Sequence, residues 1–110
     1  MYTNLQNNLN NNTPNYTAPF LWLHGESREA LLNEIKHIYE CGINAVCLES
    51  RTHEQFCEQK WYDDIKFIFD ECKKLNMRVW ILDDKHFPTG YANGIYKDKY
   101  KDLRPWTIYE

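Results

Sequence analysis

Two helix-to-strand joints of the same design constrain the fold of this 110-residue chain. In the first, Gly42 separates an amphipathic stretch from the mostly apolar residues 44–48. In the second, Asn76 separates a similar stretch from the apolar run over 77–82. Gly and Asn are the residues that most readily adopt the left-handed conformation in which helices end. The repetition predicts that each amphipathic stretch is a helix followed directly by a strand.

The remaining elements follow from apolar spacing. The run over 20–23, after Pro19, predicts a first buried strand. Ser27 is expected to cap the first helix, whose apolar face comprises Leu31, Leu32, Ile35, Ile38 and Tyr39. The second helix is expected to begin at about Trp61, with Asp63 and Asp64 near its positive end. Its apolar stripe comprises Trp61, Ile65, Ile68, Phe69, Cys72 and Leu75.

Alternating strands and helices at this spacing predict an α/β fold, with right-handed crossovers and a parallel sheet. Strands this apolar are typical of a sheet covered on both faces. Two architectures fit: the first three βα units of a (β/α)8 TIM barrel, or part of a doubly wound sheet. Residues 24–27 lack the GxGxxG pattern of a dinucleotide-binding sheet. A whole barrel takes about 250 residues, so this chain would hold an incomplete one.

Residues 1–18 are rich in Asn and contain no apolar period, so we expect a disordered tail before a barrel portion over 19–110. A net charge of −3 without a basic cluster argues against nucleic acid or an anionic membrane as partner. No apolar run approaches the roughly 20 residues that span a bilayer, and the N-terminus lacks a signal pattern. The expected location is the cytoplasm.

The four cysteines form no CxxC pair, so they do not predict a zinc site. We expect reduced thiols that pack as small apolar side chains. No metal and no cofactor are expected.

Polar residues follow each predicted strand, and the carboxyl ends of parallel strands are where ligands bind. These residues are His24, Glu26, Glu49, Arg51, Asp83, Asp84, Lys85 and His86. Carboxylates around a cleft are what glycoside hydrolysis uses, and Trp22 and Phe87 offer flat surfaces for a sugar ring. Two adjacent acids at the end of an apolar strand, Asp83 and Asp84, cost stability unless they bind or orient something.

Several of these residues also have a purely structural interpretation. Glu26 suits the positive end of the first helix, and Glu49 can pair with Arg51. His37 and His53 are predicted to be solvated surface residues.

The segment 80–94 runs from an apolar strand into acids, then an aromatic residue, Pro, Thr, Gly and a turn of small residues. It resembles the third-strand signature of the α-L-rhamnosidase-like enzymes of glycoside hydrolase family 106 and their uncharacterised bacterial relatives. Residues 18–25 and 41–46 are similar to the first strand of that group and to its approach to the second. The resemblance covers about residues 18–105 and implies a (β/α)8 barrel.

The resemblance also implies a function. It places Asp83, Asp84 and His86 in a sugar-binding subsite, with the catalytic carboxylates on later strands. We therefore expect the N-terminal part of a glycoside hydrolase that acts on O-glycosidic bonds, inactive as this fragment and with its catalytic residues unassigned. The substrate would be a carbohydrate, contacted by residues at the strand ends: His24, Glu49, Arg51, Asp83, Asp84 and His86.

Two other functions stay open. The first is a non-catalytic half-barrel whose open sheet edge associates with itself, as a homo-oligomer, or with a partner chain such as the missing C-terminal part of the barrel. The second is a metal-dependent hydrolase that uses His24, Asp83 and His86.

Overall fold

The structure, a computed structural model, describes residues 17–82 and 84–85 and the isolated positions 6, 10, 94, 99 and 102. The tail expected over 1–18 lies almost wholly outside the described residues. Three residues expected at the site, Asp83, His86 and Phe87, also lie outside them.

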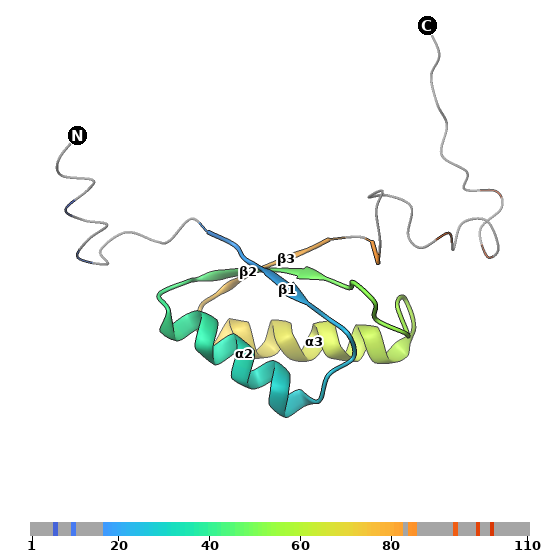
Figure 1. Cartoon of the computed structure of the whole chain (residues 1–110), viewed down its shortest axis with the longest axis horizontal. Helices are drawn as coiled ribbons and strands as arrows, with labels where there is room; N and C mark the ends of the chain where they lie inside the picture. The colour runs from blue at the N-terminus through green and yellow to red at the C-terminus, as the bar shows by residue number, and fades with distance from the viewer. Residues whose placement is uncertain are drawn as a thin grey trace, which may run out of the picture.

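Three strands and two helices alternate along the described chain (Figure 1). Their bounds are β1 (Phe20–Trp22), α2 (Arg28–Glu40), β2 (Ala45–Glu49), α3 (Gln59–Lys74) and β3 (Arg78–Ile81). The strands form one parallel sheet in the order β1-β2-β3. The α/β class and the parallel strand-helix-strand repeat are therefore confirmed.

The two helix-to-strand joints have the same geometry. Gly42 and Asn76 both have positive φ, at 77° and 54°. At the end of α2, the N–H of Gly42 donates to Tyr39 O (2.9 Å) and that of Ile43 to Ile38 O (3.3 Å). The last turn of α3 closes with the same two bonds, of 3.2 and 2.9 Å. This is the Schellman pattern, and it turns the chain from each helix directly into the next strand.

The helix starts differ from each other. Ser27 caps α2 as predicted, because its hydroxyl accepts from the N–H of Ala30 at 3.2 Å. Helix α3 begins at Gln59, earlier than expected, after an extended Glu58 whose side chain makes no capping bond. The first turn of α3 therefore contains no acidic residue, and the prediction that Asp63 and Asp64 complement its start was wrong.

The core lies between the sheet and the two helices. It comprises Leu21, Leu23, Leu31, Ile35, Val46, Leu48, Ile68, Cys72 and Met77. The predicted stripe of α3 is confirmed except at Phe69, which is half-exposed while Phe67 packs against the core. Phe69 follows the buried Ile68 by one position, which turns it about 100° around the helix and away from the sheet.

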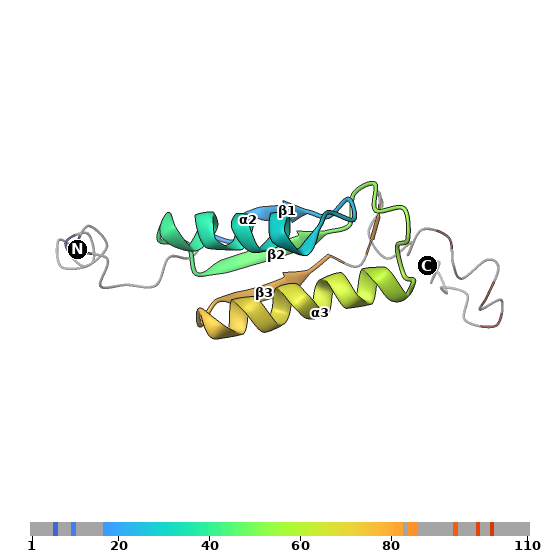
Figure 2. The same ribbon diagram turned by 90° about the horizontal axis from the view of Figure 1, so that it is seen from below.

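Both helices cover the same face of the sheet, as Figures 1 and 2 show from two directions. On the opposite face Phe20, Cys47 and Trp80 are aligned across the three strands. Phe20 and Trp80 are about 60% exposed (61% and 62%). In the described part of the chain, the predicted cover on both faces is thus found on one face only.

Candidate functional site

An ion pair marks the carboxyl end of the central strand. Glu49, the last residue of β2, is only 4% exposed. Its Oε1 accepts from Nη2 of Arg51 at 2.6 Å and from Nε at 3.0 Å. The structural interpretation of Glu49 as the partner of Arg51 is therefore confirmed, and the pair lies at the edge where ligands of parallel sheets bind.

The indole of Trp22 completes this group. Trp22 is the register partner of Glu49, so both side chains lie on the face without helices. The guanidinium carbon of Arg51 lies 5.2 Å from the centroid of the Trp22 ring, within the range of a cation–π contact. Trp22 remains half-exposed. We call Trp22, Glu49 and Arg51 the strand-end triad; it combines a carboxylate, a guanidinium and an accessible aromatic ring.

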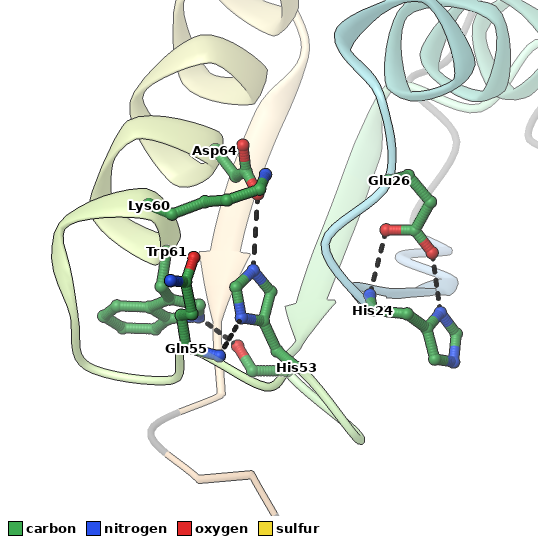
Figure 3. Close-up of polar contacts among 8 residues, drawn as sticks. His24, Glu26, His53, Gln55, Lys60, Trp61 and Asp64 are labelled. Atoms are coloured by element: carbon green, nitrogen blue, oxygen red, sulfur yellow. Dashed lines mark hydrogen bonds and ion pairs between the residues drawn. The ribbon is translucent and has the colours of Figure 1, made fainter.

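His24 and Glu26 form a second pair after β1. One carboxylate oxygen of Glu26 lies 2.7 Å from Nδ1 of His24, and the other accepts from the backbone N–H of His24 at 2.9 Å (Figure 3). Glu26 therefore folds back over its own turn. Partial burial would raise the pKa of Glu26, but bonds from the N–H groups of His24 and Glu26 and from the His24 ring together hold it below the usual 4.5.

A third group lies in the segment 50–58 between β2 and α3, which we call the β2–α3 loop. His53 is only 1% exposed, so the prediction of a solvated surface residue was wrong. Its Nε2 lies 3.3 Å from Oδ2 of Asp64, and its Nδ1 accepts the N–H of Gln55 at 3.2 Å (Figure 3). His37 is exposed, as predicted.

One sequence pattern would have predicted this burial. Asp64 lies within the apolar stripe of α3, three positions from Trp61 and four from Ile68. A carboxylate on a buried helix face needs a partner, and the loop before the helix contains one histidine. Asp64 accordingly binds both His53 and Nζ of Lys60, the latter at 2.7 Å. The indole N–H of Trp61 donates to the hydroxyl of Ser50 in the same loop.

Of the polar residues predicted to form the site after the third strand, Asp84 and Lys85 are described. Asp84 is almost fully buried. Burial raises the pKa of the Cys57 thiol; the charge of Lys99 acts in the opposite direction, and that of Asp84 raises it further. Asp83 and His86 stay predictions, because they are outside the described residues.

A hollow of about 330 Å³ lies along the free edge of β1. Its lining comprises Phe20, Leu21, Trp22, His24, Glu26, Ala30, Leu31 and Glu34. Small-molecule pockets start at roughly this size, and the hollow adjoins both the strand-end triad and the His24–Glu26 pair.

All four cysteines are free thiols, and Cys72 alone among them is buried. Within the described ranges, no three or more His, Cys, Asp or Glu side chains come together in a way that could hold a metal ion. The same part of the chain has no helix with the length and apolar character needed to cross a bilayer.

Comparisons with protein-family models, with curated proteins and with solved structures found no match to this chain.

Proposed function

We propose that this chain is the N-terminal part of a (β/α)8-barrel domain of the glycoside hydrolase type, and that its strand-end triad binds a carbohydrate. The observation that carries this proposal is the position of Glu49 and Arg51 beside the exposed ring of Trp22, at the carboxyl ends of parallel strands.

Three features support the barrel. The strands are parallel and in sequence order, and both helices lie on one face, as every βα unit of a barrel requires. A doubly wound sheet has this arrangement within one half, but the turn after β1 lacks its phosphate-binding glycines. The helix-free face carries aromatic and aliphatic side chains that closure into a barrel would place inside.

The chemistry of the triad suits a sugar. A sugar ring offers apolar C–H faces that fit an aromatic surface and hydroxyl groups that donate and accept hydrogen bonds. Trp22 supplies the aromatic surface, Arg51 supplies donors, and Glu49 supplies an acceptor. Because Glu49 is held in an ion pair, we assign it to binding and leave the catalytic carboxylates to other parts of a complete barrel.

A titration of the chain with L-rhamnose, followed by ¹H–¹⁵N NMR, tests this function. We expect saturable shifts of the Trp22 indole and Arg51 Nε resonances, and loss of the Arg51 Nε shift in Trp22→Ala. Tyr39→Ala is the matched control, since Tyr39 is an exposed aromatic residue on α2. A panel of D-glucose, D-galactose and D-mannose follows. If none of these sugars causes saturable shifts, binding by this triad is refuted.

A second candidate function is association through the helix-free face and the sheet edges. Exposed large apolar side chains on β1 and β3 favour it: Phe20, Trp22, Trp80 and Ile81. Size-exclusion chromatography with light scattering would show a defined oligomer, which Trp80→Ser should dissociate. A monomer at all concentrations would count against self-association and leave a partner chain to be sought.

A further inference from the structure

We propose that His53 is a positioning residue that fixes the turn after β1 relative to the β2–α3 loop, and so sets the geometry of the strand-end site. The consequence for sugar affinity rests on the proposed function, whereas the consequence for the turn does not.

The hydrogen bonds of His53 define its tautomer. Nδ1 accepts the backbone N–H of Gln55, so in the neutral ring the proton is on Nε2. Nε2–H therefore donates to Asp64. Both ring nitrogens have partners, and the ring is enclosed, so its orientation is fixed on two sides.

The partners of His53 are themselves fixed. Oδ2 of Asp64 also accepts from Lys60, one turn earlier on α3. The N–H of His53 donates to the carbonyl of Ser50 at 3.1 Å, and the Ser50 hydroxyl accepts from Trp61. The β2–α3 loop is thus attached to the first turns of α3 at both Ser50 and His53. Ser50 stands between Glu49 and Arg51 in the sequence, so this attachment reaches the strand-end triad.

Gly25 connects the same ring to β1. A Cβ placed on Gly25 would lie 3.7 Å from Nε2 and 3.9 Å from Cε1 of His53. The Gly25 backbone, with φ of +95°, therefore lies beside the ring edge that faces Asp64, about one methyl group away. Its two neighbours are His24 and Glu26, whose mutual pairing shapes the turn. The imidazole therefore borders this turn on the side of the β2–α3 loop.

Two substitutions test the two ends of the His53 ring one at a time. In His53→Gln the side-chain amide reaches the Nε2 position, where it can donate to Asp64 and contact Gly25. In His53→Asn the shorter amide reaches the Nδ1 position, where it can accept from Gln55 but contacts neither Asp64 nor Gly25. If the Nε2 end positions the turn, only the Gln variant should preserve it. The matched control is His37→Asn, because His37 is exposed on α2.

The readouts are the three-bond HN–Hα couplings of Gly25 and Glu26, which report the φ angles of the turn, and the affinity for L-rhamnose. We expect wild-type couplings and an affinity within about threefold in His53→Gln, but changed couplings and about a tenfold loss in His53→Asn. Equal behaviour of the two variants would overturn the proposal. If no form binds L-rhamnose but only the Asn variant changes the Gly25 couplings, the sugar function fails and the positioning role stands.

A measurement on the wild-type chain tests the proposal even where the variants do not fold. We expect a nuclear Overhauser contact between Hε1 of His53 and the Hα protons of Gly25. A folded wild-type chain without that contact would also overturn the proposal.

Discussion

Arg51 holds Glu49 through one carboxylate oxygen, Oε1, which accepts from both Nε and Nη2. The pair is asymmetric in exposure, because the Glu49 side chain is buried while the Arg51 side chain is about one third exposed. Burial of an ionised carboxylate is tolerated only while its partner remains in place. Glu49 and Arg51 are therefore needed both for the stability of the fold and for the proposed sugar binding.

Glu49→Gln should lower the free energy of unfolding by about 1–3 kcal/mol, because the buried group loses a charge-assisted bond to Arg51. Urea denaturation at pH 7 measures this. Asp70→Asn is the control: its ion pair with Lys66 is exposed, water screens it, and the urea midpoint should not change. A Gln variant as stable as the wild type would mean that the pair contributes nothing to folding.

Gly42→Ala should destabilise the chain by about 1–2 kcal/mol through backbone conformation alone. The residue has φ of +77°, and an added Cβ would meet no atom within 4 Å, so no steric clash contributes. Asn76→Gly, at the equivalent position with φ of 54°, should leave stability unchanged or raise it. The urea midpoint should thus fall in Gly42→Ala but not in Asn76→Gly; a fall in both variants would contradict the shared geometry.

Cys72 should make stability fall above pH 9. Burial, with a smaller contribution from Glu71, raises the pKa of its thiol from 9.0 to about 11. A raised folded-state pKa gives stability that is complete below pH 9 and is lost as pH rises toward 11, because only the unfolded thiol ionises in that range. The loss should reach up to about 3 kcal/mol.

Urea denaturation between pH 8 and 11 measures this loss of stability, and Cys72→Ala should remove the larger part of it. Alkylation provides an independent check. At pH 8.5 iodoacetamide should modify the exposed Cys41 well before Cys72. Equal rates at the two thiols in the native chain would show that Cys72 is not protected.

Glu26 should have the opposite pH dependence. Its depressed pKa gives stability that is present above pH 4.5 and is lost as pH falls through the folded-state value. Glu26→Gln should therefore be less stable than the wild type at pH 7, by under about 1 kcal/mol because the group is partly solvated. The difference should disappear at pH 2–3. Thermal unfolding at the two pH values would decide it, and a pH-independent difference would exclude the His24 interaction as its cause.

The fold was predictable because each joint carries its own local chemistry. The capping residue Ser27 and the turn residues Gly42 and Asn76 end or begin elements through interactions within a few positions. The Glu49–Arg51 pair was predictable for the same reason, since the two residues are close in sequence and follow a buried strand.

The burial of His53 was not predicted, because it depends on tertiary packing. Its environment is made by Gly25, Gln55 and Asp64, which come from three separate segments. A polar residue in a polar loop gives no periodic pattern. Only the acid within the apolar stripe of α3 pointed to a buried partner.

Strands β2 and β3 each pair with the strand that precedes them in the chain, through Phe20 with Cys47 and Ala45 with Arg78. Each pairing needs only the segment between its own two strands, so it closes a smaller loop than a pairing of β1 with β3 would. A chain leaving the ribosome can therefore complete β1, α2 and β2 before α3 and β3 are synthesised. Substitutions that disrupt β2 would prevent both strand pairings, whereas substitutions that disrupt β3 would leave the pairing of β1 with β2 intact.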